Sequence, residues 1–337
     1  KTLMAEVSEI LKDSFGREHN YLRISLTEKC NLRCTYCMPE SGVVLSPKSA
    51  LMTTEEVIHF ATLFAKNGVN KIRLTGGEPL LRKDFADILS ALAQLPVKLS
   101  ITTNAILVDR HIDTFKRCGL RDINVSLDTL NAEKFDAITK RDHFTKAMDN
   151  IDLLLQEDFN VKLNVVLMKH FNENEIVDFI DYTRDKKLTV RFIEFMPFDG
   201  NNWDKSKLIG YDEELQTVQS HYAAADLVPL PNEKNFTARN FKIKDYQGNF
   251  GIISTVTNPF CDVCNRIRLT ANGKLKNCLF SNGETDLLTA HRAGESTEDL
   301  IQQAVQKKQA VRAGMTSIGD FENMDNHNNR SMITIGG

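Results

Sequence analysis

A short loop rich in cysteine is the part of the sequence best suited to chemistry. Cys30, Cys34 and Cys37 occur in the run EKCNLRCTYCMPE, with three and then two residues between them. Thiolates this close together can hold one metal centre, but a structural zinc site takes four protein ligands. A [4Fe–4S] cluster also has four irons to ligate, so three cysteines leave one iron open. The loop therefore indicates a reactive iron–sulfur cluster, with a zinc site completed by His19 or a distant cysteine as the alternative.

A second cysteine group lies in the last third of the chain. Cys261 and Cys264 are separated by two residues, and Cys278 follows after thirteen more. A second cluster with an open iron fits this trio, and a zinc ribbon short of one ligand is the alternative. The seven cysteines form two tight groups plus Cys118, which favours metal binding in a reducing compartment over disulfides. We interpret the isolated Cys118 as a small core residue.

Basic side chains in apolar, strand-like runs are a third feature. An inward-facing cation is unfavourable unless it meets an anion, and guanidinium groups bind phosphates in a bidentate way. Strand alternation places Arg266 and Arg268 on one face, although a solvated surface pair has the same pattern. Thr102 adds a hydroxyl, and Glu194 or Asp128 are alternative structural partners for these cations. A chain of net charge −3 that directs cations inward predicts a small polyanionic substrate, and the other cations are Arg23, Arg73, Lys162 and Arg191.

Two further motifs follow predicted strands. The run 76–79, Gly-Gly-Glu-Pro, allows the backbone to approach a ligand closely and to bind an ammonium group, or it is a plain turn. Ser126 and Met196 also stand at strand ends, where they would otherwise be interpreted as a turn residue and a core residue.

The elements that must position these residues alternate between strands and amphipathic helices. Thr53 and Glu56 have capping-box spacing at the start of one helix, and Gly68 would end it. The predicted strands are Tyr21–Thr27, Lys71–Thr75, Lys98–Thr103, Ile123–Leu127, Lys162–Met168 and Val190–Met196. The predicted helices are Thr54–Asn67, Asp84–Gln94, Asp109–Cys118, Thr145–Asp158 and Glu173–Lys186.

Six β-α units in series predict an α/β fold with a parallel sheet and an outer layer of helices. Six units are too few for a closed eight-fold barrel, so we expect an incomplete (βα)6 TIM-like barrel whose active site lies at the C-terminal strand ends. The pattern changes near Phe198, and the segment 241–278 reads as a C-terminal, mostly antiparallel β cap that carries the second cluster. We therefore expect two domains, residues 1–200 and 201–337.

Composition excludes several classes of protein. The 337 residues are 42% hydrophobic and 26% charged, as in a globular protein with a core. The net charge of −3 implies no general attraction to nucleic acid or membranes. The chain shows no apolar run near the length of a membrane span and no secretory signal. It also lacks eukaryote-specific extensions, so we expect a bacterial cytoplasmic location.

The first cysteine loop, followed by Gly-Gly-Glu-Pro, resembles the radical S-adenosylmethionine (SAM) superfamily. With the runs KIRLTGGEP, INVSLD, VRFIEFMPFDGN and CNRIRL and the final IGG, nearly the whole chain resembles the GTP 3′,8-cyclase family (MoaA type). The resemblance implies a lyase that converts GTP to (8S)-3′,8-cyclo-7,8-dihydroguanosine 5′-triphosphate while SAM is cleaved to methionine and 5′-deoxyadenosine. That reaction is the first step of molybdenum cofactor biosynthesis, and it uses two [4Fe–4S] clusters.

The resemblance also implies roles for individual residues. Cys30, Cys34, Cys37, Cys261, Cys264 and Cys278 match cluster ligands, and Tyr36, Gly77, Ser126 and Met196 match SAM-binding positions. Arg23, Arg73, Thr102, Lys162, Arg266, Ile267 and Arg268 match GTP-binding positions. Gly336 and Gly337 match a tail that assists catalysis, although residues alone would predict a frayed end. Ala105 stands where relatives usually have glycine, and its Cβ disfavours a positive φ there.

Partners are implied in the same way: flavodoxin or ferredoxin as electron donor, cyclic pyranopterin monophosphate synthase downstream and a homodimer, with no nucleic acid and no membrane. One alternative is another two-cluster radical SAM enzyme, such as a peptide-modifying enzyme. A regulatory iron–sulfur or zinc protein without enzymatic activity is another, but it would need neither the Gly-Gly-Glu-Pro motif nor the inward cations.

Overall fold

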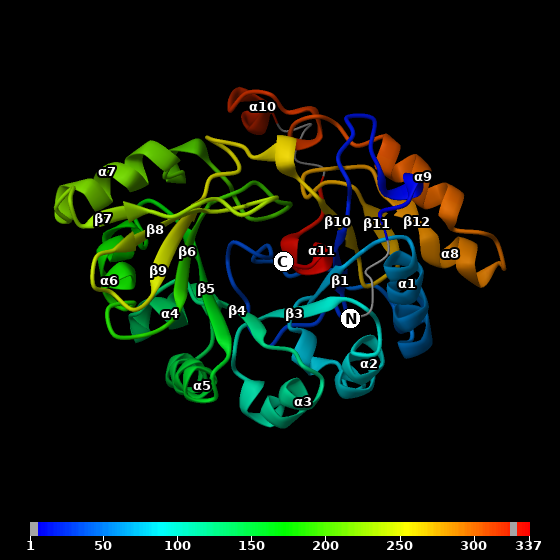
Figure 1. Cartoon of the computed structure of the whole chain (residues 1–337), viewed down its shortest axis with the longest axis horizontal. Helices are drawn as coiled ribbons and strands as arrows, with labels where there is room; N and C mark the ends of the chain where they lie inside the picture. Colours follow the sequence, from blue (N-terminus) through cyan, green and yellow to red (C-terminus); the bar gives the residue numbers. More distant parts are fainter. Residues whose placement is uncertain (1–5, 324–328) are drawn as a thin grey trace.

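A single curved sheet organises the molecule (Figure 1). The structure, a computed structural model, describes residues 6–323 and 329–337. Six strands in the middle of the sheet pair in parallel and in chain order. They are β1 (Tyr21–Ser25), β2 (Lys71–Thr75), β3 (Lys98–Thr103), β4 (Asp122–Ser126), β5 (Asn160–Leu167) and β6 (Thr189–Glu194). The predicted incomplete parallel barrel is confirmed, with strand bounds within two residues of those expected.

Helices cover the outer face of these strands (Figure 1). They are α1 (Thr54–Lys66), α2 (Phe85–Leu92), α3 (Ile112–Arg117), α4 (Ala132–Thr139), α5 (Phe144–Gln156) and α6 (Ile176–Asp181). The helix predicted over Glu173–Lys186 is wrong in extent, because α6 ends at Asp181. The carbonyls of Thr183 and Arg184 instead accept hydrogen bonds from the backbone of Gly248 and Gln247, so tertiary contacts override the local periodicity.

The C-terminal strands continue the same sheet at both edges. At one edge β9 (Asn249–Ile253) pairs in parallel with β6, and β8 (Arg239–Ile243) and β7 (Leu227–Pro229) follow antiparallel. At the other edge β10 (Arg266–Leu269) pairs in parallel with β1. There β11 (Lys274–Lys276) and β12 (Thr285–Asp286) follow antiparallel. Among these C-terminal strands, the pairs β7–β8, β8–β9, β10–β11 and β11–β12 are antiparallel, as expected for the cap. However, the strands extend the barrel at its two ends instead of forming a separate sheet.

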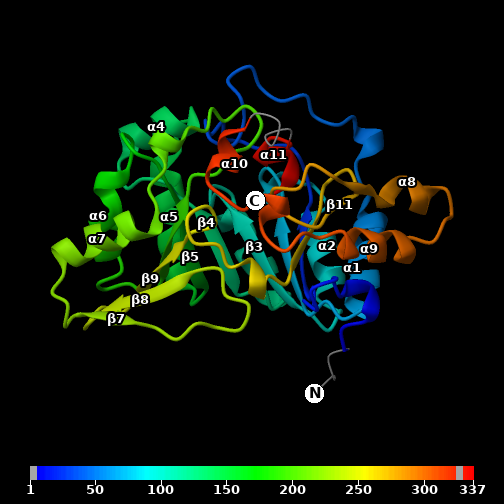
Figure 2. The ribbon, with the colours of Figure 1, turned by 90° about the horizontal axis from the view of Figure 1, so that it is seen from above.

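Further helices flank these edges (Figure 2). Those at the edges are α7 (Tyr211–His221), α8 (Leu287–Arg292) and α9 (Glu298–Gln306). The short helix α10 (Gly319–Glu322) follows them in the chain, and α11 (Met332–Ile335) lies inside the curve of the sheet (Figure 1). None of the helices in the described ranges combines the length and the apolar character needed to span a lipid bilayer.

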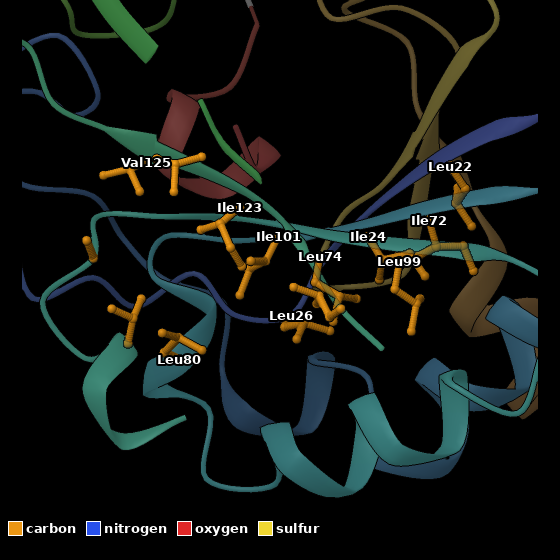
Figure 3. Close-up of a cluster of buried hydrophobic side chains, with 14 of the residues drawn as sticks. Leu22, Ile24, Leu26, Ile72, Leu74, Leu80, Leu99, Ile101, Ile123 and Val125 are labelled. Carbon is orange, nitrogen blue, oxygen red and sulfur yellow. The ribbon is translucent and has the colours of Figure 1, made fainter. Parts of the chain in front are cut away.

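The main hydrophobic core lies between the strands and the outer helices (Figure 3). Its residues occupy alternate positions, such as Leu22 and Ile24 in β1 and Ile72 and Leu74 in β2, all fully buried. Because side chains of a strand alternate between faces, the residues between them point into the barrel. The interior therefore receives Arg23, Arg73 and the polar residues at the matching inward positions of the other strands.

The helix α1 begins with the predicted capping box. The backbone N–H of Glu56 donates to Thr53 Oγ1 (3.2 Å), and the N–H of Thr53 donates to Glu56 Oε2 (2.7 Å). Replacing Thr53 by alanine is expected to lower the free energy of unfolding by about 1 kcal/mol, because one helical N–H loses its partner. Urea unfolding measures the change, with Thr62→Ala in the same helix as the control. An equal effect of the two substitutions would contradict the capping role.

Candidate active site

Both cysteine trios line one cavity inside the curved sheet. Its volume is about 310 Å³, and its walls include Cys30, Cys34 and Cys37 together with Cys261, Cys264 and Cys278. All six are free thiols. The first trio follows the C-terminal end of β1, as predicted for a barrel site. The second lies around β10 and β11, so the edge strands bring it to the same interior.

The two-glycine motif fastens the first cysteine loop to its neighbours. The backbone N–H of Gly77 donates to the carbonyl of Thr27 and that of Glu78 to the carbonyl of Lys29, both at 2.8 Å. The buried Glu78 carboxylate accepts bonds from Thr103 Oγ1 and the Asn104 N–H, also at 2.8 Å. The loops that follow β1, β2 and β3 are therefore one connected unit.

Replacing Gly77 by alanine is expected to weaken SAM binding about tenfold or more, because overpacking of this kind strains a site by about 1–3 kcal/mol. A Cβ at Gly77 would overlap the Lys29 carbonyl and lie 3.1 Å from the Cβ of Cys30, so the cysteine loop must shift. Equilibrium binding of SAM to anaerobically reconstituted protein measures the effect. Gly319→Ala, whose Cβ meets only the Ser317 hydroxyl at 3.7 Å, is the matched control.

Burial makes the first trio unfavourable as free thiolates. It raises the pKa of Cys30 to about 11 and, with neighbouring anionic groups including Asp128, raises the pKa of Cys34 and Cys37 further. The Tyr36 hydroxyl is hydrogen-bonded to Asp128, and burial raises the pKa of that hydroxyl as well. A bound metal centre deprotonates its thiol ligands and supplies the missing positive charge, so this donor set fits an iron–sulfur cluster.

The second trio lies in a more cationic environment. Burial by itself would raise the pKa of Cys264, but Arg266 and Lys308 lower it to about 6. Lys308 Nζ donates to Cys264 Sγ (3.4 Å) and to the Arg266 carbonyl (2.8 Å). Arg17 braces the same loop by donating to the carbonyl of Cys261 at 2.7 Å. Charge and hydrogen bonds thus prepare a thiolate at this position.

The donor geometry differs from that of a single-ion site. No three His, Cys, Asp or Glu side chains within residues 6–323 and 329–337 converge closely enough to hold one metal ion. A cluster places each thiolate on a different iron, so its ligands stand farther apart. His19, the suggested fourth zinc ligand, has its Nε2 3.0 Å from Asp13 Oδ2 and lies outside the described residues that line the cavity.

Most of the predicted substrate-binding residues gather on the inner face of adjacent strands. Arg23 stands opposite Arg268 on β10 and opposite Arg73 on β2 in the strand register. Arg23, Thr102, Arg266 and Arg268 line the cavity. Arg73 lies beside its wall, with Nη1 3.5 Å from Thr102 Oγ1 and Nε donating to the Tyr21 hydroxyl at 2.6 Å.

Lys162 and Ile267 lie outside the set that lines the cavity. Burial, together with Arg191, lowers the pKa of Lys162 to about 8, which shows that this amine lies near the other cations on the inner face of the strands. The Ile267 side chain is buried in the hydrophobic core on the opposite face of β10, so only its backbone can contact a ligand. Sequence adjacency to Arg266 and Arg268 does not carry the side chain into the site.

The barrel cations lack acidic partners. Within the part of the chain that the structure describes, none of the following forms an ion pair: Arg23, Arg73, Lys162, Arg191, Arg266 and Arg268. Glu194 instead accepts bonds from the backbone of Val256 and Thr257, and Asp128 accepts one from Val166. Among the described residues, neither carboxylate therefore forms the ion pair with an inward cation that the sequence offered as an alternative.

Burial destabilises the charged form of these cations. Burial lowers the pKa of Arg191 to about 10 and shifts the pKa of Arg23 and Arg268 in the same direction. The Nε atoms of Arg23 and Arg191 are buried without a hydrogen-bond partner. Buried polar groups are almost always paired, so these atoms indicate a ligand that carries negative charge.

The positions matched to SAM binding also meet at the cavity. Tyr36, Gly77, Ser126 and Met196 all line it. Among the polar residues of the lining, the sequence interpretation did not assign Asn124, Asn164, Lys276 and Lys308, and it named Arg191 only as an inward cation. Asn124 and Asn164 occupy inward positions of β4 and β5, and the Asn164 Oδ1 atom has no partner. Their signal was a polar residue at alternate positions of an otherwise apolar strand.

The C-terminal tail ends inside the barrel (Figure 1). Arg268 Nη1 donates to the carbonyl of Gly336 at 2.6 Å, and Gly337 lines the cavity. Gly336 has φ of +89°, and a Cβ there would lie 2.6 Å from Thr75 Oγ1. The tail is therefore docked, and the expectation of a frayed end that residues alone would favour is wrong.

The expectation that Ala105 disfavours a positive φ is also wrong. Its φ is +67°, in the left-handed region, although the residue carries a Cβ. Asn150 Nδ2 donates to the carbonyl of Ala105 at 2.7 Å and to that of Ile106 at 3.1 Å. Tertiary hydrogen bonds fix the turn and hold the residue in this strained conformation.

Two family models match the chain: the Radical SAM superfamily over residues 24–183 and Molybdenum Cofactor Synthesis C over residues 188–314. The chain is 45% identical to "GTP 3',8-cyclase, mitochondrial" from Arabidopsis thaliana, covering 98% of this chain and 84% of that protein. It is 39% identical to "GTP 3',8-cyclase" from Listeria welshimeri, covering 98% of this chain and all of that protein.

Longer relatives and one solved structure complete the comparison. The chain is 47% identical to human "Molybdenum cofactor biosynthesis protein 1" over 98% of its length, but it spans about half of that relative (52%). Streptococcus suis SuiB bound to precursor peptide SuiA superposes with a TM-score of 0.63 at 14% identity, covering 95% of this chain and 77% of that one. At such low identity the likeness shows the fold alone.

Proposed function

We infer that this chain, which belongs to the GTP 3′,8-cyclase family of the radical SAM superfamily, converts GTP to (8S)-3′,8-cyclo-7,8-dihydroguanosine 5′-triphosphate. SAM is cleaved to methionine and 5′-deoxyadenosine in the same reaction, which opens molybdenum cofactor biosynthesis. The observation that carries the proposal is the set of unpaired barrel cations, which lie in and beside a cavity lined by both cysteine trios.

The family carries two [4Fe–4S] clusters and uses SAM. When bound, the first cluster and SAM would supply the one-electron chemistry that starts the reaction, and the second cluster would supply a Lewis-acidic iron for the guanine end of GTP. Cys30, Cys34 and Cys37 would hold the first cluster, and Cys261, Cys264 and Cys278 the second. Tyr36, Gly77, Ser126 and Met196 would orient SAM between the strand ends and the first loop.

The barrel cations bind the triphosphate. Arg23, Arg266 and Arg268 present guanidinium groups to the cavity, and Thr102 adds a hydroxyl. Arg73 and Lys162 contribute positive charge from beside the wall. Fixing both ends of GTP places its ribose against SAM, which is catalysis by positioning. The tail residues Gly336 and Gly337 occupy the interior, where they exclude water and assist the reaction at the substrate.

Anaerobic incubation of the reconstituted protein with GTP, SAM and dithionite tests the function. We expect 5′-deoxyadenosine and a cyclised nucleotide to appear together while GTP disappears, and ATP in place of GTP to give no cyclised product. Release of 5′-deoxyadenosine without consumption of GTP would reject the substrate and favour the alternative, a two-cluster radical SAM enzyme that modifies a peptide.

The remaining proposals concern organisation and partners. We propose residues 1–200 and 201–337 as the two functional units, a homodimer, and flavodoxin or ferredoxin as electron donor. The product would pass to cyclic pyranopterin monophosphate synthase. We propose a cytoplasmic location, and the name of the Arabidopsis relative makes a mitochondrial one the alternative.

A further inference from the structure

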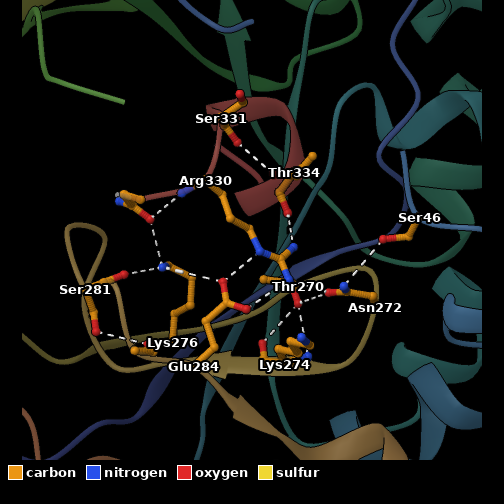
Figure 4. A network of polar contacts seen from close by, with 12 residues as sticks. Ser46, Thr270, Asn272, Lys274, Lys276, Ser281, Glu284, Arg330, Ser331 and Thr334 are labelled. Atoms are coloured by element: carbon orange, nitrogen blue, oxygen red, sulfur yellow. Dashed lines mark hydrogen bonds and ion pairs between the residues drawn. The ribbon is translucent and has the colours of Figure 1, made fainter. Parts of the chain in front are cut away.

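The C-terminal tail reaches the cavity through a polar anchor at its base, not only through the contact of Arg268 with Gly336. Arg330, just before α11, forms a bidentate pair with Glu284 (Figure 4). Its Nε lies 2.7 Å from Glu284 Oε1, and its Nη2 donates to Glu284 Oε2 at 2.9 Å. Planar pairs of this kind are among the strongest hydrogen-bonded contacts in proteins.

Other contacts converge on the same guanidinium. Nη2 also donates to Asn272 Oδ1 at 3.0 Å, and Nη1 donates to the carbonyl of Thr334 at 3.3 Å. Nη1 lies 3.9 Å from Glu28 Oε1, and Glu28 flanks the first cysteine loop. Arg330 therefore joins three parts of the chain: the tail itself, the edge strands β11 and β12, and the segment that leads to Cys30.

The neighbouring residue strengthens the anchor. Asn329 Oδ1 accepts a bond from Lys276 Nζ at 3.0 Å, and Asn329 Nδ2 donates to the Leu279 carbonyl at 2.7 Å. Lys276 lies 3.7 Å from Glu284 as well, so the carboxylate is shared by two cations. Beyond the anchor, Ser331 Oγ donates to the carbonyl of Asp199, in the segment that follows β6, at 3.0 Å.

We infer that Arg330 is a positioning residue whose ion pair with Glu284 latches the C-terminal tail into the cavity and thereby holds the Gly336 carbonyl on Arg268. The latch lies outside the residues assigned to cluster, SAM or GTP binding. Its contacts are polar and partly exposed, with 22% of the Arg330 side chain and 15% of the Glu284 side chain accessible. The catalytic consequence rests on the proposed function, but the docking of the tail does not.

Limited proteolysis with thermolysin tests the latch directly. Thermolysin cuts before apolar residues such as Ile333 and Ile335, which are 2% and 1% exposed in the docked tail. We expect Arg330→Ala and Glu284→Ala each to accelerate this cut about tenfold or more, as measured by intact mass, because charge-assisted bonds are lost. The effects of the two substitutions should be less than additive in the double variant, since both remove the shared Arg330–Glu284 interaction.

Arg292→Ala is the matched control. Arg292 makes the same bidentate contact with Glu56, at 2.7 Å and 2.9 Å, but on α8 at the outer surface. Arg330→Lys keeps the charge and most of the volume but not the planar fork, so it should be cut at an intermediate rate even if the alanine variant folds poorly. Cutting no faster than in Arg292→Ala would overturn the latch, and additive effects in the double variant would overturn its assignment to the pair.

Activity separates the latch from the substrate assignment. In the holoenzyme Arg330→Ala should lower kcat about tenfold while the iron content and the KM for SAM stay unchanged, because Arg330 contacts neither a cysteine nor a residue assigned to SAM. Normal kcat in a variant with a released tail would overturn the positioning role. If GTP is not consumed even by the unmodified protein, the proposed function fails, and the proteolysis result still decides the latch.

Discussion

Cys34→Ser is expected to abolish the cleavage of SAM and to lower the iron content from about eight atoms per chain to about four. The three thiols of the first loop line the cavity together, and burial raises the pKa of Cys34 strongly. A hydroxyl at this position ionises far less readily than a thiol, so it cannot replace a thiolate ligand in a buried site. With two thiolates the loop should not retain its cluster.

Iron analysis and the formation of 5′-deoxyadenosine in the presence of dithionite measure this effect. Cys118→Ser is the matched control, because Cys118 is the one cysteine of the seven outside the two trios; its Sγ contacts the Ser90 hydroxyl at 3.6 Å. Cys264→Ser should give the complementary result: a similar loss of iron with the first loop intact. A Cys34→Ser protein that retained all of its iron would remove this residue from the ligand set.

The double substitution Arg266→Ala with Arg268→Ala is expected to weaken GTP binding by about 10²- to 10⁴-fold. Each charge-assisted contact contributes roughly 1.5–3 kcal/mol, and two such losses correspond to that change in Kd. Both guanidinium groups line the cavity without a carboxylate partner in the described residues, so no internal salt bridge is broken when they are removed. The affinity should fall while the iron content stays the same.

Calorimetric titration of the anaerobic holoenzyme with GTP measures the loss. The double variant Arg110→Ala with Arg117→Ala removes the same net charge from exposed positions and controls for long-range electrostatics. Because Arg268 also holds the Gly336 carbonyl, Arg266→Ala alone should be compared with the double variant to separate the phosphate contact from tail docking. Unchanged affinity would exclude both arginines from the site.

The parallel barrel could be predicted because its signals are local. Runs such as Lys71–Thr75 and Lys98–Thr103 combine apolar alternation with flanking turn residues, and they match β2 and β3 in full. The same alternation predicted the inward direction of Arg23 and Arg268, which the strand register confirms. The helix α4 was missed, although Asn131 caps it by accepting a bond from the Lys134 N–H at 2.9 Å.

Features that depend on distant pairing could not be predicted. The local pattern of the segment 241–278 indicates antiparallel strands. It does not indicate that β10 pairs with β1 and β9 with β6, because the sequence of a strand does not specify which strand lies beside it. The docked tail depends on the contact between Arg330 and Glu284. Arginine and glutamate are common at protein surfaces, so nothing in the sequence indicates that these two residues pair. Strand alternation directs the Ile267 side chain into the core. The family resemblance assigned the whole run 266–268 to GTP binding and therefore included Ile267.

The pairing of β1 with β10 fixes the distance between the two cysteine trios. One cysteine trio begins beyond the far end of β1, and two cysteines of the other precede the start of β10, where Arg266 stands opposite Tyr21. The five residues of β1 span about 16 Å at roughly 3.3 Å per residue. That length sets the gap between the two trios that the proposed substrate, GTP, would bridge. An insertion of one residue in either strand would change the gap and also turn outward the cations that follow it in that strand, so length and charge are specified together.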